Sequence, residues 1–219
     1  MKKIVFLASG NGGNLKFFFL AQKNNIISKI QLIVIADREC GSLEFARNNS
    51  LENYVVNYKR SDAKEFTDVL EKIKPDIIVT NWHKIIDEVT IRTFKGKFIN
   101  LHYSRLPAFG GLIGIEPIKR AYDQGCRYVG PTCHLVDEGV DTGKIISQAI
   151  FLTDIPMVDA VDLMFRKGCL VLLNGIQQVT GEKLIGKIAT STEDFLFSPT
   201  LGFDEKAFSE DFWKELASA

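Results

Sequence analysis

Short apolar runs alternate with longer stretches of helical periodicity through the first two-thirds of the chain. Continuous apolar runs of this length are typical of strands buried on both faces of a parallel sheet. The predicted strands cover Ile4–Ala8, Gln31–Ala36, Asn53–Val56, Asp76–Thr80 and Lys97–Leu101. The predicted helices cover Asn14–Lys23, Gly41–Asn49, Asp62–Ile73 and Ile86–Phe94. This alternation predicts an α/β fold with a mostly parallel sheet and helices on both faces.

The third of these helices carries signals at both of its ends. Asp62 and Glu65 stand three residues apart, which is the spacing of a capping box, so the helix is expected to begin near Asp62. Lys74 and Pro75 are expected to end it, because proline disfavours helical backbone in the residue before it.

The pattern changes from Tyr128 onward. Tyr128–Val136 and Lys144–Phe151 are rich in strand-forming residues and are joined by a turn-prone segment. A β-hairpin and an irregular active-site loop would both satisfy this pattern. Val158–Val179 then predicts a long helix.

After Leu184 the composition shifts toward Ser, Thr, Asp, Glu and aromatic residues. The aromatic residues of this part are Phe195, Phe197, Phe203, Phe208, Phe212 and Trp213. They are too many for a disordered tail. We therefore expect one domain over residues 1–184 and a C-terminal extension over 185–219. An extension strapped across the domain is favoured over a segment that docks a partner.

The charge balance bears on partners. Lys+Arg and Asp+Glu are both 27, and the formal charge is zero. Without a basic excess, nucleic acid and anionic membranes are not expected as partners, and a small-molecule substrate is favoured. The four cysteines contain no C-x-x-C pair, which favours neither a disulfide framework nor a zinc site. The first apolar run is too short for a signal peptide, so we expect a cytoplasmic protein.

The first candidate site is Ser9–Leu15, a glycine-rich turn between the first strand and the first helix. Glycines allow a sharp turn, and backbone amides at a helix N-terminus favour an anion such as phosphate. The segment lacks the third glycine of the dinucleotide fingerprint and the Gly-Lys-Ser/Thr of a Walker loop. By itself it is equally consistent with a tight turn that binds nothing.

The second candidate is the pair Asn100 and His102, which alternate at the end of an apolar strand and so project from the same face. A loop with Pro107 and several glycines follows. An amide can donate to a developing oxyanion, and an imidazole can transfer protons near neutral pH. A histidine at such a place can also be purely structural, but its pairing with Asn100 favours a functional role.

The third candidate is the segment from His134 to Gly143, which carries the acids Asp137, Glu138 and Asp141. The acids follow a strand, in a glycine-containing loop, where exposed turn residues are the ordinary interpretation. Metal binding by His134 with these acids is disfavoured, because nothing in the spacing defines a coordination geometry.

In this order and spacing the three segments resemble the folate-dependent formyltransferases, above all the glycinamide ribonucleotide branch. Ser9–Leu15 is similar to the phosphate loop of that branch. Asn100-Leu101-His102 and Ser104-Arg105-Leu106-Pro107 are similar to its Asn-x-His pair and the Ser-Leu-Leu-Pro that follows. His134–Gly143 is similar to its acidic loop, whose last Asp corresponds to Asp141. The resemblance covers roughly residues 1–184 and implies a Rossmann-like fold with a twisted sheet.

The resemblance implies formyl transfer from 10-formyltetrahydrofolate, as co-substrate, to a primary amine, with no metal. Asn100, His102 and Asp141 would be catalytic. The substrate phosphate would be bound by Gly12, Gly13, Asn14 and Lys167. The folate would be bound by His83, Lys84, Ile85, Ile86, Leu135, Val136, Asp137, Glu138, Gly139 and Val140. The amine would most naturally be glycinamide ribonucleotide in purine biosynthesis.

Two departures leave the amine open. Gly110-Gly111-Leu112-Ile113 stands where the branch has a Pro-Gly-Leu-His run. Arg166-Lys167-Gly168-Cys169 stands where the branch has Gln-Glu-His. A nucleotide-linked amino sugar is therefore an alternative acceptor, and a non-catalytic nucleotide-binding module is an alternative of another class. A homodimer is one expectation.

Overall fold

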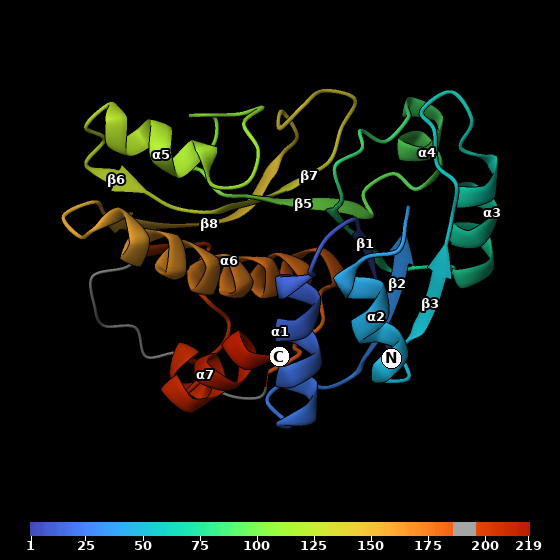
Figure 1. Cartoon of the computed structure of the whole chain (residues 1–219), viewed down its shortest axis with the longest axis horizontal. Coiled ribbons are helices and arrows are strands. Elements are labelled where there is room, and N and C mark those ends of the chain that lie inside the picture. Colours follow the sequence, from blue (N-terminus) through green and yellow to red (C-terminus); the bar gives the residue numbers. More distant parts are fainter. Residues whose placement is uncertain (186–195) are drawn as a thin grey trace. The chain divides into compact units, whose positions relative to one another are not determined.

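The computed structural model describes residues 1–185 and 196–219, which form two compact units (Figure 1). The first unit contains Met1–Ile99 and Phe208–Ala219, and the second contains Asn100–Ala207.

The first unit is built on parallel strands. They are β1 (Lys2–Ala8), β2 (Ile30–Ala36), β3 (Glu52–Val55), β4 (Ile77–Asn81) and β5 (Phe98–His102), of which β5 continues into the second unit. Their order is β3-β2-β1-β4-β5, and each neighbouring pair is parallel. The central strand β1 is almost wholly buried, as its apolar run predicts, with Ile4 in register with Leu32 on one side and Ile77 on the other.

Five helices belong to the described part of this unit. They are α1 (Gly13–Lys23), α2 (Gly41–Asn48), α3 (Lys64–Ile73), α4 (Glu88–Thr93) and α7 (Glu210–Ser218). All five strands and all four helices predicted for residues 1–101 are present, with bounds shifted by at most two residues. The prediction of a mostly parallel sheet with helices is confirmed.

The predicted capping box of α3 is wrong. The residue before the helix is Ala63, which provides no side-chain cap. Asp62 instead closes a tight turn, because its backbone exchanges two hydrogen bonds with the backbone of Lys59. Glu65 accepts a hydrogen bond from the Asn57 backbone amide at 3.1 Å, which leaves it no capping role. The predicted end is correct, since Lys74 adopts a left-handed conformation with φ 56°.

The second unit is mainly antiparallel. Its strands are β6 (Tyr128–Val129), β7 (Thr132–Leu135), β8 (Ile145–Leu152) and β9 (Leu196–Ser198). β6, β7 and β9 each pair with β8 in antiparallel fashion. Of the two alternatives left open by the sequence, β7 and β8 form the hairpin, with a register shift between Cys133 and His134. Gly143 is required there, because a Cβ atom at this position would lie 1.7 Å from the Leu135 carbonyl oxygen.

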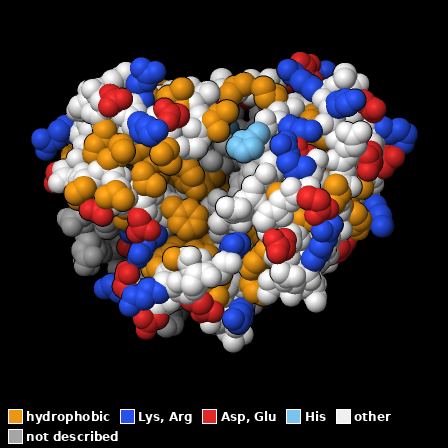
Figure 2. All heavy atoms as spheres, in the orientation of Figure 1, with side chains coloured by type: hydrophobic (Ala, Val, Ile, Leu, Met, Phe, Trp, Pro, Cys, Tyr) orange, Lys and Arg blue, Asp and Glu red, His pale blue; other side chains and the backbone are white. Residues whose placement is uncertain are grey.

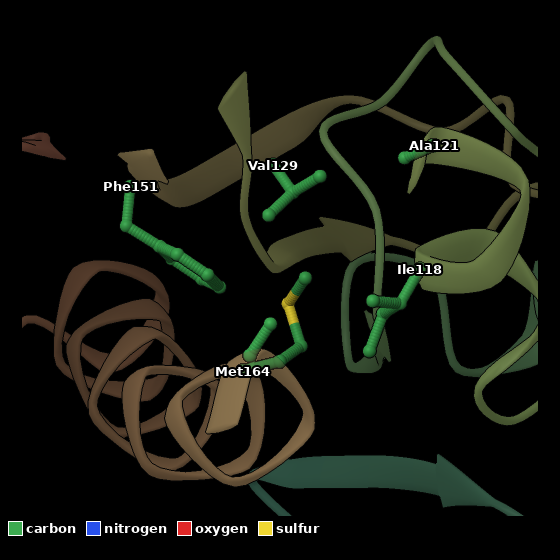
Figure 3. Close-up of a cluster of buried hydrophobic side chains, with 6 residues drawn as sticks. Ile118, Ala121, Val129, Phe151 and Met164 are labelled. Carbon is green, nitrogen blue, oxygen red and sulfur yellow. The ribbon is translucent and has the colours of Figure 1, made fainter. Parts of the chain in front are cut away.

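Two α-helices lie in the described part of this unit. The long helix is α6 (Met157–Thr180), as predicted, and a shorter helix, α5 (Glu116–Asp123), was not predicted. α5 follows a segment dense in glycine and has Pro117 in its first turn, where a missing amide costs nothing. A buried cluster joins α5, β6, β8 and α6 through Ile118, Ala121, Val129, Phe151 and Met164 (Figure 3).

The described part of the C-terminal extension contributes to both units. β9 extends the sheet of the second unit, and a 3₁₀ turn follows at Glu205–Ala207. In the first unit α7 packs on α1, where the Phe17 ring stacks on Trp213 and on Phe208 with centroids 5.7 and 5.1 Å away. Phe195 lies outside the described residues. The predicted boundary between a domain and an extension at residue 184 stays a prediction. The two compact units divide the chain elsewhere, after Ile99 and after Ala207. No helix in the described ranges is long and apolar enough to cross a membrane.

Candidate active site

Asn100 and His102 lie on the last residues of β5, where the strand begins the second unit. Their spacing of two places both side chains on one face of the strand. His102 is buried, with 7% of its surface exposed, and Asn100 is partly buried. The sequence-based expectation that they share a face therefore agrees with the structure.

Both ring nitrogens of His102 have oxygen neighbours. Nε2 lies 3.0 Å from the carbonyl oxygen of Phe109, and Nδ1 lies 3.3 Å from Oδ2 of Asp141. A carbonyl oxygen only accepts, so Nε2 must carry the proton of that hydrogen bond. Nδ1 then faces a carboxylate. The contact with Asp141 becomes a hydrogen bond when Nδ1 carries a proton.

Asp141 is the acid of the β7–β8 connection that reaches His102. Its side chain is 14% exposed, and its Oδ2 accepts a hydrogen bond from the Gly111 amide at 2.8 Å. Burial raises the pKa of this carboxyl. The pKa is nevertheless lowered overall, because neighbouring His134, the Gly111 amide and His102 all stabilise the charged form. Asp141 is therefore an anion at neutral pH.

The neighbouring acid Asp137 has a different task. Its Oδ1 accepts hydrogen bonds from the Gly139 amide at 3.1 Å and from the Thr142 hydroxyl at 2.7 Å. These contacts close the loop on itself. Glu138 is exposed. The geometry thus separates Asp141, which contacts His102, from the two acids that the residue pattern alone could not distinguish from it.

His134 was singled out in the sequence only as a doubtful metal ligand, and its place beside Asp141 was missed. Nε2 of His134 lies 3.5 Å from Oδ1 of Asp141 and is buried without a hydrogen bond. Its Nδ1 lies 2.8 Å from the Leu135 carbonyl oxygen, which holds the ring. Asp141 is consequently flanked by two imidazoles. Alternation along β7 could not mark this side chain, because Thr132, Cys133 and His134 are all buried and the register shifts between Cys133 and His134.

Two residues of this cluster have unusual backbone. Phe109 and Asp141 have φ values of 61° and 56°, in the left-handed region. Aspartate tolerates this region well, whereas for phenylalanine it is unfavourable, and such strain is common at functional sites. The strained residue Phe109 is the one whose carbonyl oxygen contacts His102.

The glycine-rich loop begins α1 in the first unit. Gly12 precedes the helix with φ 68° and offers no side-chain cap to the amides of Gly13 and Asn14. A Cβ atom on Gly12 would lie 2.4 Å from the Ser42 hydroxyl, so both conformation and space require glycine here. Asn14 is buried, and its Oδ1 accepts from Asn81 at 3.2 Å.

Asp37 anchors the start of that loop. Its carboxylate accepts hydrogen bonds from the Ser9 hydroxyl at 2.8 Å and from Arg38 Nη2 at 2.7 Å, and Lys84 Nζ lies 3.3 Å away. Burial raises the pKa of Asp37, but the bonds from Arg38, Ser9 and Lys84 outweigh it and lower the pKa to about 2. This carboxylate serves the architecture of the first unit.

The segment assigned to the pterin by resemblance follows β4 in the first unit. His83 is exposed, Ile85 is 51% exposed and Ile86 is buried. Lys84 is held in the unit, because its Nζ also donates to the Tyr58 carbonyl oxygen at 2.7 Å. In the second unit, Leu135 and Val136 are partly buried and residues 137–140 are exposed.

Lys167 on α6 was expected to bind a substrate phosphate. Its side chain is 10% exposed, its Nζ forms an ion pair with Glu205 at 2.7 Å, and the ammonium lies over the Phe197 ring. Its charge is therefore compensated within the second unit, and its phosphate contact stays a prediction. Within the described ranges no three His, Cys, Asp or Glu residues gather as metal ligands.

Comparisons with known proteins show the family of the chain. Residues 2–166 match the protein family described as "Formyl transferase". The chain is 32% identical over 158 residues to the chloroplastic phosphoribosylglycinamide formyltransferase of Vigna unguiculata, covering 68% of this chain but only 51% of that protein. It is 27% identical over 175 residues to the phosphoribosylglycinamide formyltransferase of Bacillus subtilis, covering 76% of this chain and 88% of that protein.

A solved structure shares the fold. The phosphoribosylglycinamide formyltransferase of Anaplasma phagocytophilum superposes with a TM-score of 0.70 at 25% identity, covering 88% of this chain and 92% of that one. The fold class expected from the sequence is confirmed by this likeness.

Proposed function

Because the chain belongs to the formyltransferase family, we propose that it transfers a formyl group from 10-formyltetrahydrofolate to the amine of glycinamide ribonucleotide. This would be a step of purine biosynthesis. The names of the Vigna and Bacillus relatives support this acceptor. The observation that carries the proposal is the His102–Asp141 contact beside Asn100, because formyl transfer needs both an oxyanion donor and a proton-transfer group.

The chemistry starts with attack of the amine nitrogen on the formyl carbon, which forms a C–N bond and a tetrahedral oxyanion. The Asn100 amide would donate to this oxyanion, an interaction whose removal typically costs about 10²–10³ in rate. Collapse of the intermediate breaks the bond between the formyl carbon and N10 of the folate. The amine loses a proton and N10 gains one, so the step is balanced without an external acid.

His102 and Asp141 would move these protons. An imidazolium beside the oxyanion stabilises its charge and can give a proton to the leaving nitrogen. Asp141, an anion held by Gly111, would orient the His102 ring, stabilise positive charge that develops on it during the reaction, and accept the proton of the amine. The Nε2 proton of His102 is directed at the Phe109 carbonyl oxygen at 3.0 Å. For His102 to donate this proton to the substrate, the hydrogen bond between its Nε2 and the Phe109 carbonyl oxygen must first break.

The substrate-binding residues are proposed from the resemblance. We assign the phosphate to the amides of Gly13 and Asn14 after Gly12, because the α1 N-terminus favours an anion there. Lys167 stays a secondary candidate for the phosphate. The folate is assigned to His83–Ile86 and to Leu135–Val140, mainly through backbone groups. No metal takes part in this proposal.

The setting of the reaction is also proposed. We place it in the cytoplasm, although relatives named as chloroplastic show that other compartments occur in the family. Small-molecule substrates are the proposed partners, without nucleic acid or membrane, and a homodimer stays a prediction.

One observation favours a different acceptor. Lys167, paired with Glu205, occupies the helix position where the resembled branch carries a carboxylate. A nucleotide-linked amino sugar is therefore the second candidate.

The experiment is a parallel acceptor assay. The protein is incubated with 10-formyltetrahydrofolate and glycinamide ribonucleotide, a panel of nucleotide-linked amino sugars, or no amine, and tetrahydrofolate formation is followed. We expect turnover with glycinamide ribonucleotide and only background without amine. Turnover with the nucleotide-linked amino sugars alone would show that one of them, and not glycinamide ribonucleotide, is the acceptor. Equal folate consumption with and without amine would refute formyl transfer.

A further inference from the structure

A cavity of about 260 Å³ lies in the second unit, between α5, β6 and the loop that follows β5. It has room for about nine water molecules at ~30 Å³ each, which is enough for a small organic molecule. Its lining residues are Tyr103, Ser104, Arg105, Ala108, Phe109, Pro117, Ile118, Ala121, Cys126, Arg127, Tyr128 and Val129. None of the roles assigned above to substrate or folate uses this cavity.

The charge of the lining has one sign. Arg105 and Arg127 are its only charged residues, and no acid lies among the lining side chains. Both are exposed, and neither guanidinium makes an ion pair within residues 1–185 or 196–219. Two uncompensated guanidinium groups favour an anion, and the planar fork of arginine matches a carboxylate best.

Apart from Ser104, the rest of the lining is apolar or aromatic. Its aromatic lining residues are Tyr103, Phe109 and Tyr128. Ile118 and Val129 also line the cavity, and both belong to the buried cluster of Figure 3. Hydrophobic side chains also gather on the surface over α5 and β6 (Figure 2), where Tyr128 is 52% exposed. Such a lining favours a flat apolar body over a bare ion.

We propose that this cavity binds a small aromatic carboxylate. The carboxylate pairs with Arg105 and Arg127, and the ring packs against the aromatic and apolar residues of the lining. This site does not depend on the proposed formyl transfer. It nevertheless involves the same loop, because Phe109 lines the cavity and also contacts His102 through its carbonyl oxygen.

The test uses Cys126, a partly exposed thiol in the cavity lining, as a reporter. The intact protein is alkylated with iodoacetate or, separately, with neutral iodoacetamide, and labelled peptides are quantified by mass spectrometry. We expect the iodoacetate-to-iodoacetamide rate ratio at Cys126 to fall at least threefold in the Arg105→Gln, Arg127→Gln double variant. The ratio at Cys40, in the first unit, should stay constant.

Arg120→Gln provides the matched control, since Arg120 is an exposed arginine of α5 outside the cavity lining. It should leave the Cys126 ratio at the wild-type value. The buried Cys133 should stay unlabelled in all variants, which reports an intact fold. An unchanged Cys126 ratio in the double variant, or an equal fall in Arg120→Gln, would overturn the proposal.

A protection experiment tests the ligand itself. We expect 4-hydroxybenzoate to slow iodoacetamide labelling of Cys126 at least threefold and saturably, with no effect at Cys40. The uncharged 4-hydroxybenzyl alcohol and inorganic phosphate should give no protection. Absence of saturable protection by 4-hydroxybenzoate would contradict the site, and equal protection by the alcohol or by phosphate would contradict the ligand class.

Discussion

The buried carboxylate of Asp37 makes a quantitative prediction about the stability of the first unit. Its side chain has no exposed surface and binds Ser9, Arg38 and Lys84. Its pKa is lowered from 3.8 to about 2. At about 1.4 kcal/mol for each unit of pKa, the charged form contributes about 2 kcal/mol to the free energy of unfolding. Asp37→Asn should remove about that amount at pH 7.

The pH dependence has a definite sign. A carboxyl whose pKa is lowered by folding binds its proton more readily in the unfolded chain. Its contribution to the free energy of unfolding is therefore complete at pH values above 3.8. It is lost as the pH falls toward the folded value of about 2. The difference between wild type and Asp37→Asn should therefore be about 2 kcal/mol at pH 7 and about 1 kcal/mol at pH 3.

Urea denaturation of both proteins across this pH range measures the difference. Asp68→Asn is the matched control, because Asp68 pairs with Lys64 on the exposed surface of α3 and should change stability little. Equal unfolding free energies for wild type and Asp37→Asn at pH 7 would refute the reasoning. So would a difference that stays constant down to pH 3.

Three further predictions concern the second unit. Gly143→Ala should unfold or strongly destabilise the β7–β8 hairpin, since a Cβ there would lie 1.7 Å from the Leu135 carbonyl oxygen. Thermal denaturation measures this effect, and an unchanged unfolding midpoint would contradict the prediction. Burial raises the pKa of the Cys133 thiol to about 12, so this thiol should resist thiol reagents at pH 8 and react only after unfolding. Rapid labelling of Cys133 in the native protein would contradict this prediction. His134→Gln should raise the pKa of Asp141, because His134 lowers it in the native protein. The acid limb of the profile of formyl-transfer activity against pH should therefore move to higher pH. An acid limb at the wild-type pH would contradict this prediction.

The strands of the first unit were predictable because strands buried on both faces of a parallel sheet have continuous apolar sequences. Ile4–Ala8 is such a run, and β1 is buried along most of its length. Helix α5 was not predicted, because the glycines before it point to a loop and its own eight residues provide too short a periodic pattern. The capping box at Asp62 failed because a local turn with Lys59 used the same residue.

The candidate site was predictable only in part. Strand alternation placed Asn100 and His102 on one face, but it could not choose among the three acids of the later loop. That choice came from resemblance, and the geometry now gives it a physical basis, since Asp141 alone of the three contacts a histidine of β5. The contact of Phe109 with His102 involves a backbone carbonyl, which no residue pattern encodes.

The proposed role of Asp141 can be tested by comparing two substitutions in the second unit that each replace one carboxylate by an amide. Asp141→Asn removes the charge beside His102, whereas Asp154→Asn changes an exposed carboxylate that has no assigned role in catalysis or binding. We predict that Asp141→Asn lowers kcat/KM for formyl transfer more than tenfold, a loss of more than about 1.4 kcal/mol. Asp154→Asn should stay within about threefold of wild type, less than about 0.7 kcal/mol. Retention of more than a tenth of wild-type activity by a folded Asp141→Asn protein would contradict the account.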